Sequence, residues 1–197
     1  MYKKVRLKDT VEVPPEHLPD QTEPEVPPAL IKRLLQDKLE GRMDEEVGSV
    51  VTVIDVHDVG EGAVVPNRPS VYYEAEFDAI TFDPEMQEVV DGEVVEVVNF
   101  GAFVGIGPVD GLLHVSQISD EYLAYDGENQ QLASRDSNRV LSVGDAVRTR
   151  IVTKSIDERN PRDSKIGLTA KQPGLGKHGW LEEERQKRSE PGAPAGE

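Results

Sequence analysis

The chain has 197 residues, 38 of them acidic and 22 basic, so that its formal net charge is −16. It contains no cysteine, which excludes disulfides, thiolate zinc sites, iron–sulfur clusters and cysteine nucleophiles. No apolar run approaches the ~20 residues that a membrane span requires, and no apolar stretch of signal-peptide length opens the sequence. We therefore expect a soluble, cytoplasmic protein without a membrane partner.

The acidic residues are spread along the chain rather than gathered in one block, which argues against a disordered acidic tail. Two interpretations remain: an acidic partner-binding face, or a surface adapted to a halophilic cytoplasm, where ~1 M salt shortens the Debye length to about 3 Å. We favour the halophilic surface. Against this background, the window from Arg148 to Lys177 carries 8 cations and 3 carboxylates. Such a strip is typical of a surface that faces a polyanion, although cations at strand edges would also explain it.

The first half of the chain has the pattern of a small sheet with one main helix. Apolar and charged residues alternate from Tyr2 to Val13, which predicts a half-buried strand. Apolar residues at helical spacing predict a helix over 29–39. Further strands are expected over 50–56 and 71–79, with a turn or loop tip at Asp58-Val59-Gly60-Glu61-Gly62. Residues 1–82 are therefore expected to form an α+β domain with an antiparallel sheet.

Residues 83–172 have a different pattern, with five short predicted strands. These strands are expected over 89–98, 103–106, 112–115, 143–152 and 165–170. The polar stretch 116–139 has no strand pattern and is expected to be irregular. Five short strands fit an all-β, closed Greek-key barrel such as the OB-fold. Residues 173–197 are expected to form a tail, with a frayed helix from Leu181 and a disordered end.

The sequence offers no catalytic or cofactor site, so neither a cofactor nor a metal is expected. No Gly-rich turn is followed by Lys-Ser or Lys-Thr, as a phosphate loop requires. The four histidines are scattered and form no metal-spaced pair. No Ser or Thr lies in a recognisable nucleophile motif. We therefore expect a chain without enzymatic activity of its own.

The residues that do indicate a function lie in the expected barrel. Phe100 and Phe103 lie at the start of its second strand, and Gly101 between them lets the backbone bend. Two ring faces open to solvent can stack nucleobases, at ~1–3 kcal/mol per base. His114 on the next strand could stack, or donate to a phosphate or ribose oxygen. Cations on the last two strands lie where a nucleic-acid backbone could run: Arg148, Arg150, Lys154 and Lys165. Core packing of both phenylalanines is the alternative.

This part of the sequence resembles the S1 RNA-binding domain over about residues 85–172. The matching motifs are, in order, Gly92-Glu93-Val94, Asn99-Phe100-Gly101-Ala102-Phe103-Val104, Gly111-Leu112-Leu113-His114-Val115-Ser116 and Val143-Gly144-Asp145. The resemblance implies that Phe100, Phe103 and His114 face RNA. It also implies that Asp157 and Lys165 match the family's acidic and basic positions around the last hairpin. The chain departs from the family by a longer hairpin at Glu158–Ser164 and an insertion over about 123–140.

The chain to about residue 181 is similar to the E′ family of archaeal RNA polymerase stalk subunits, relatives of the seventh subunit of eukaryotic RNA polymerase II. The matching segments are the tip at 58–62, the strand Tyr72–Phe77, the junction Phe82-Asp83-Pro84 and the sequence Gln172–Gly176. The resemblance implies a truncated RNP-like N-terminal domain whose tip, at Gly60 and Gly62, docks on the polymerase core. It also implies a heterodimer with the F subunit of the polymerase and binding of nascent single-stranded RNA. A plain turn that needs positive φ would equally explain both glycines.

Together these features predict a non-catalytic stalk subunit of DNA-directed RNA polymerase, an enzyme whose active site lies in other subunits. An S1-domain factor in translation or RNA decay, which binds mRNA or tRNA, is the alternative. An S1-bearing nuclease would need a metal or base cluster that the sequence does not offer.

Overall fold

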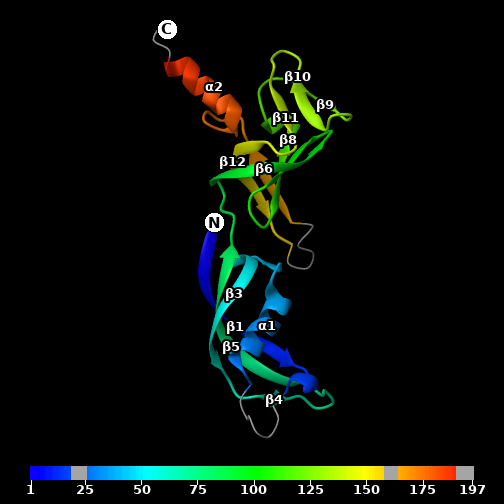
Figure 1. Ribbon diagram of the computed structural model, residues 1–197, viewed down its shortest axis with the longest axis vertical. Helices are drawn as coiled ribbons and strands as arrows, with labels where there is room; N and C mark the ends of the chain where they lie inside the picture. The colour runs from blue at the N-terminus through cyan, green and yellow to red at the C-terminus, as the bar shows by residue number, and fades with distance from the viewer. Residues whose placement is uncertain (19–25, 158–163, 190–197) are drawn as a thin grey trace. The chain divides into compact units, whose positions relative to one another are not determined.

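The computed structural model describes residues 1–18, 26–157 and 164–189. The chain folds into two compact units. The first is formed by Met1–Asp83, joined among the described residues by Ile156 and Asp157, and the second by the remaining residues from Pro84 onward. Figure 1 shows an α+β unit formed by the earlier residues and a β-rich unit formed by the later ones.

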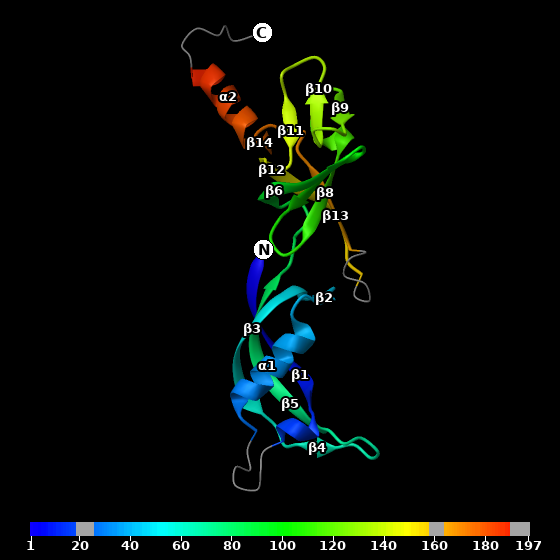
Figure 2. The same cartoon turned by 45° about the vertical axis from the view of Figure 1, so that its right-hand side comes forward.

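The first unit is an antiparallel sheet dominated by three strands of 12 residues. These strands are β1 (Tyr2–Val13), β3 (Gly48–Val59) and β5 (Val71–Phe82). The sheet order is β1-β5-β3-β2, with β2 (Met43–Asp44) at one edge and β4 (Ala63–Val64) paired with β5. A short 3-10 turn, η1 (Pro15–His17), follows β1. The helix α1 (Pro28–Leu39) lies on one face of the sheet in all the side views (Figure 1, Figure 2).

The core of this unit lies between α1 and the sheet. Ile31 and Leu35, four residues apart and so on one face of the helix, are fully buried, as is Phe77 on β5. The helix begins with Pro28 at its first position, where a missing N–H costs nothing. It ends before Gly41, whose φ of +78° is the left-handed conformation that terminates many helices. The expected α+β fold is therefore confirmed.

The opposite face of the sheet is charged. Asp78 on β5 is buried, yet it accepts from Lys4 Nζ at 2.9 Å, Arg6 Nε at 3.1 Å and His57 Nε2 at 2.8 Å. Lys4 first, then His57 and Arg6, hold the pKa of the Asp78 carboxyl well below its usual range. The buried charge is thus compensated from both neighbouring strands.

The second unit contains a closed five-stranded barrel. Its strands are β6 (Val89–Val98), β7 (Gly101–Gly105), β8 (Asp110–His114), β12 (Ala146–Ser155) and β13 (Lys165–Thr169). The first three form an antiparallel meander, β8 pairs in parallel with β13, and β12 pairs with both β13 and β6. Every barrel strand therefore has two neighbours, and the expected OB-type barrel is confirmed. Its interior is filled by alternating side chains such as Val104, Leu113 and Ile151.

The expectation that residues 116–139 form no strand was wrong. After a 3-10 turn, η2 (Val115–Gln117), a small antiparallel sheet follows in the order β11-β10-β9. Its strands are β9 (Leu123–Asp126), β10 (Gln131–Ser134) and β11 (Val140–Ser142). Each strand contributes one large buried side chain, Leu123, Leu132 or Leu141. One apolar residue per strand is too few to produce a period-two pattern in the sequence.

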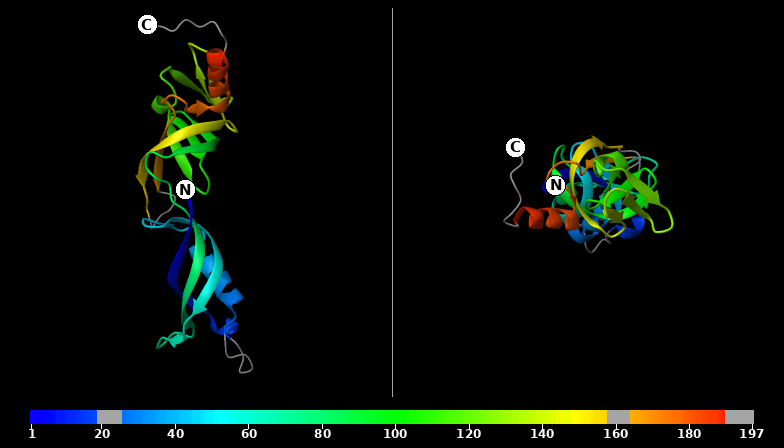
Figure 3. Two further views of the ribbon diagram at one scale, coloured as in Figure 1. Left: turned by 90° about the vertical axis from the view of Figure 1, so that its left-hand side faces the viewer. Right: turned by 90° about the horizontal axis from the view of Figure 1, so that it is seen from above.

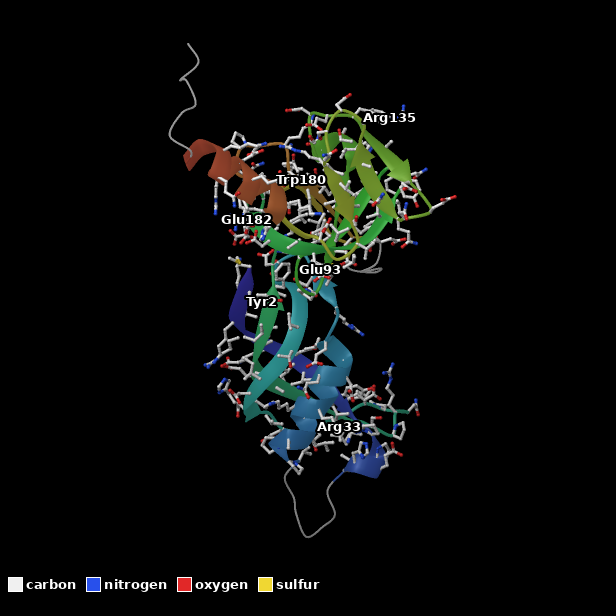
Figure 4. All side chains as sticks on the ribbon, turned by 45° about the horizontal axis from the view of Figure 1, so that its top comes forward. Tyr2, Arg33, Glu93, Arg135, Trp180 and Glu182 are labelled. Atoms are coloured by element: carbon white, nitrogen blue, oxygen red, sulfur yellow. The ribbon has the colours of Figure 1, made fainter. Side chains whose placement is uncertain are left out.

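The residues after the barrel pack against it before they form a helix. β14 (Gly176–Lys177) pairs with β12, and α2 (His178–Ser189) follows directly. Trp180 and Leu181 are buried, and the Arg139 guanidinium lies 5.4 Å from the Trp180 ring centroid. Figure 4 shows Trp180 where α2 meets the barrel, and Figure 3 shows the helix extending away from it. The expected disordered end, residues 190–197, lies outside the described residues.

Neither α1 nor α2, the two α-helices of the described segments, is long and apolar enough to cross a bilayer.

The α1–sheet core gives a stability prediction. Leu35→Ala removes a fully buried side chain and should lower the free energy of unfolding by about 2–5 kcal/mol. Urea denaturation followed by circular dichroism measures the change. Arg33→Ala, on the exposed side of the same helix (Figure 4), is the matched control and should change stability by less than about 0.5 kcal/mol. Equal effects of both substitutions would contradict this placement of the core.

Candidate nucleic-acid interface

Two phenylalanines lie on the outside of the barrel at the start of β7. Phe100 precedes the strand and is 46% exposed, and Phe103 is half-buried. Their ring centroids are 6.4 Å apart in an edge-to-face arrangement of 84°. Ala102 and Val104, which alternate with Phe103, are the β7 residues that fill the barrel interior. Core packing, the alternative to an open aromatic pair, is therefore wrong for Phe100 and incomplete for Phe103.

The glycine between the two rings is required by a close approach of two strands. A Cβ on Gly101 would lie 2.4 Å from the Leu113 carbonyl oxygen and 2.9 Å from His114 Cα. Its φ of +159° lies at the limit of the region that favours glycine. One residue earlier, the Phe100 carbonyl accepts the Val115 N–H at 2.9 Å. The backbone beside both rings is therefore fixed against β8.

His114 lies on the same outer surface as the rings. It is opposite Gly101 in the β7–β8 register, and Leu112 is opposite Phe103. Side chains of opposite residues emerge on the same face, and Gly101 has none, so His114 and Phe103 are diagonal neighbours. His114 is exposed, whereas Leu112 is half-buried between Phe103 and Gly167 of β13. Sequence reasoning missed Leu112, because a leucine in a barrel strand is expected inside.

The cations expected along one strip occupy different faces of the β12–β13 hairpin. Lys165 is opposite Ser155 and exposed, whereas Lys154 is opposite Ile166, whose side chain is buried in the interior. Lys154 and Lys165 therefore leave the hairpin on opposite faces. Arg150, opposite Thr169, has a buried Nε without a hydrogen-bond partner among the described residues.

Arg148 is engaged in a local ion pair. Its Nε and Nη2 donate to the Asp91 carboxylate of β6 at 2.8 and 3.0 Å, and His178 Nε2 lies 3.1 Å from the same group. These contacts, that from Arg148 above all, lower the pKa of Asp91 to about 2, and Asp91 raises the pKa of Arg148. The three residues join β12, β6 and the start of α2. Arg148 is 57 positions from Asp91 in the chain and His178 is 87 positions from it, so no local sequence pattern indicates this cluster.

Part of the last hairpin lies outside the described residues. Asp157 follows β12 and is half-buried. The lengthened segment Glu158–Ser164 lies outside the described residues except for Ser164, and so do Arg159 and Arg162 of the basic window.

Neither glycine of the expected tip, Gly60 or Gly62, has a positive φ, and the space around each of them differs. The Gly60 N–H donates to the Glu74 carbonyl at 2.8 Å, and a Cβ there would make an ordinary contact. A Cβ on Gly62 would lie 2.8 Å from Val71 Cγ1 and 2.9 Å from Tyr73 Cζ. The turn explanation based on positive φ was therefore wrong, and Gly62 is needed for a close approach to β5.

Within the part of the chain that the structure describes, no group of three His, Asp or Glu side chains is placed to hold a metal ion. A cleft of about 320 Å³ lies between residues 118–121, which follow η2, the segment 170–176 and α2. Four of its charged side chains form two pairs, Lys171 with Asp120 at 2.9 Å and Arg139 with Glu184 at 3.0 Å. The fifth, Glu121, accepts from the Ser134 hydroxyl at 2.7 Å.

The barrel and its exposed aromatic face are the features of an S1 domain. Residues 83–164 match the family model of the S1 RNA binding domain. Residues 8–69 match the model of the SHS2 domain found in the N terminus of Rpb7p/Rpc25p/MJ0397. The fold and the candidate site therefore define a two-domain protein that combines an SHS2 domain with an S1 RNA-binding domain.

Curated relatives extend the match to nearly the whole chain. The chain is 37% identical to DNA-directed RNA polymerase subunit Rpo7 of Sulfolobus acidocaldarius over 96% of this chain and 100% of that protein. It is 36% identical to the subunit of the same name from Saccharolobus solfataricus over 92% of this chain and 97% of that protein. The chain belongs to the Rpo7 family of DNA-directed RNA polymerase subunits, which confirms the expected stalk-subunit family.

Among solved structures, the chain is similar to RNase R of Mycoplasma genitalium at 22% identity and a TM-score of 0.35. The match covers 42% of this chain and 13% of that one. A likeness this low establishes nothing further about the function.

The Asp91 cluster gives a pH prediction. The pKa of Asp91 is about 2 in the folded chain against an ordinary value of 3.8, so its ion pair stabilises the fold fully above pH 3.8. This stabilisation is lost as the pH falls from about 3.8 to about 2. Asp91→Asn should therefore lower the thermal midpoint near neutral pH, and the difference from the wild type should shrink over that acidic window.

Differential scanning calorimetry at a series of pH values measures both midpoints. Asp110→Asn, the same change at an exposed aspartate of β8, serves as the control. A difference between Asp91→Asn and the wild type that is constant from about pH 6 down to about pH 2 would disprove the assignment.

Proposed function

We propose that this chain is a non-catalytic stalk subunit that docks on the RNA polymerase core together with the F subunit and guides nascent single-stranded RNA over its barrel. Membership of the Rpo7 family supports the association with the polymerase. The open pair of Phe100 and Phe103 beside His114 supports the RNA contact, and it is the observation on which that part rests.

The RNA contact is proposed to depend chiefly on stacking. Phe100 has an accessible ring, and base stacking contributes ~1–3 kcal/mol per base whatever the base. Salt weakens phosphate contacts in proportion to their number, and the surrounding protein carries a net charge of −16. Stacking therefore contributes more than cations in a salty cytoplasm, which is the compartment that we infer from the acidic surface.

The charged residues are assigned secondary roles in this proposal. Lys165 is exposed on the face of Phe103 and supplies a phosphate contact, to which Arg150 adds at the other end of β13. Lys154 emerges on the face opposite to Lys165 and is given no direct RNA contact, and Asp157 is kept as a candidate only by the resemblance to the S1 family. Arg148 contributes least, because Asp91 already compensates its charge.

Docking on the core is assigned to the tip at Gly60 and Gly62. The adjacent residues Val64 and Val65 are 72% and 40% exposed. Val64 ends the short strand β4 and Val65 follows it, so two exposed apolar side chains adjoin and offer a partner an apolar contact. Gly62 keeps this segment close to β5 and so presents the valines outward.

The stacking proposal predicts a ranking of variants. Phe100→Ala combined with Phe103→Ala should weaken binding of a labelled single-stranded RNA by at least about 30-fold in ~1 M salt, because two stacking surfaces are lost. Lys165→Ala should weaken it by less than about 5-fold at that salt concentration. Fluorescence anisotropy measures the affinities. Tyr122→Ala, which removes another exposed aromatic ring of the same unit, should have no effect.

The reverse order, with Lys165→Ala more harmful than the double phenylalanine variant, would contradict the stacking proposal. Equal losses for Tyr122→Ala and the double variant would show that the effect is not specific to the phenylalanine pair, which would also contradict the proposal.

The docking proposal predicts the outcome of affinity purification. The tagged chain should bring down the F subunit and the large polymerase subunits from lysate, and Val64→Asp should reduce their recovery by at least about 10-fold, since it buries a charge in an apolar contact. Val95→Asp, the same change at a 48% exposed valine of β6, is the matched control. Recovery of ribosomes or exoribonucleases instead of polymerase would favour the translation or RNA-decay function.

A further inference from the structure

Ser116, two positions after His114, contacts one ring nitrogen of that histidine through both its backbone N–H and its hydroxyl. The Ser116 backbone N–H donates to His114 Nδ1 at 3.2 Å, and Ser116 Oγ lies 2.7 Å from the same nitrogen. A backbone N–H can only donate, so Nδ1 must accept and carries no proton. In a neutral imidazole the proton is then on Nε2, which makes Nε2–H a hydrogen-bond donor.

The turn that holds Ser116 is itself fixed on both sides. Val115 donates its N–H to the Phe100 carbonyl at 2.9 Å, which joins the turn to β7. The Gln117 carbonyl accepts the Ala170 N–H at 2.7 Å, and its side-chain Oε1 accepts from Thr169 Oγ1 at 2.8 Å. Ser116 therefore has little freedom to move, and the His114 ring is positioned before any ligand arrives.

We infer that Ser116 is a positioning residue that fixes His114 as a neutral Nε2–H donor toward the acceptor oxygens of single-stranded RNA. Phosphate, ribose and base carbonyl oxygens all share the chemistry that such a donor recognises. The inference rests on the RNA-binding function proposed above. It adds a residue that does not touch RNA and acts through His114.

A neutral donor suits this protein for two reasons. A neutral donor does not neutralise a phosphate and so displaces few counterions, which means that salt weakens its hydrogen bond far less than a cation–phosphate contact. The hydrogen bond from Nε2–H is also directional. A base stacked on the adjacent phenylalanine rings is held in place, so that the His114 donor can select one RNA oxygen. His114 is exposed beside Phe103 and so meets both conditions.

The first test uses the free chain and needs no RNA. Long-range ¹H–¹⁵N correlation spectra of the histidine side chains report the tautomer, and four histidines give a simple spectrum. The His114 signal, identified by its loss in His114→Ala, should show the Nε2–H form. Ser116→Ala keeps the backbone N–H and removes the Oγ–H donor, so Nδ1 is left with the longer of its two hydrogen bonds. It should therefore raise the share of the Nδ1–H form, and Ser116→Thr should restore the wild-type pattern. A wild-type ring protonated on Nδ1 would overturn the inference.

The second test measures affinity for a short labelled oligouridine. Ser116→Ala should weaken binding about 3- to 10-fold, as expected for one hydrogen bond, and Ser116→Thr should restore it. Ser119→Ala is the matched control, because its hydroxyl accepts from the Glu121 N–H in the following turn. In a His114→Ala background, Ser116→Ala should have no further effect. An undiminished effect in that background would indicate a purely structural role and overturn the inference.

The outcomes separate this inference from the function on which it rests. If the double phenylalanine variant loses RNA but Ser116→Ala binds normally, only the role of Ser116 fails. If the wild-type chain does not bind oligouridine at all, both the proposed RNA contact and the inference fail.

Discussion

The close approach of β7 and β8 at Gly101 is the constraint on which the candidate interface depends. With no side chain at this position, the two backbones come so near that a methyl group would clash with the Leu113 carbonyl. The same approach lets the Phe100 carbonyl reach the Val115 N–H, and that bond continues the ladder into the turn that holds Ser116. Aromatic rings, histidine and turn thus form one rigid surface because a single glycine follows Phe100 in the sequence.

Much of this arrangement could be predicted from the sequence, because its signals are local. The alternation from Tyr2 to Val13 gave the bounds of β1, and the spacing of Ile31 and Leu35 placed the helix. The small sheet β9–β10–β11 could not be predicted, since each of its strands buries one large residue and its polar groups satisfy one another. Glu121, for example, accepts from Ser134 at 2.7 Å, a contact across 13 residues that no window of sequence reveals.

The basic window shows a second limit of sequence reasoning. Arg148, Lys154 and Lys165 lie near one another in the sequence. The pairing register of the strands decides on which face of the sheet each side chain emerges, and neighbouring carboxylates decide whether its charge is already compensated. The Arg148–Asp91 pair joins strands 57 residues apart in the chain, and Lys154 faces away from Lys165 because it lies opposite Ile166. A linear count of cations therefore overstates the positive surface, and this strengthens the case for rings and neutral donors as the principal contacts.

Among the described strands, those of the small sheet β9–β10–β11 share no backbone ladder with the barrel. Its three strands lie between η2 and β12 in the chain, and β8 pairs directly with β13 without them. The five barrel strands consequently close into a barrel without pairing to this inserted segment. A change of length between β9 and β11 therefore leaves the backbone pairing of β7 with β8, and with it the surface beside Gly101, unaltered.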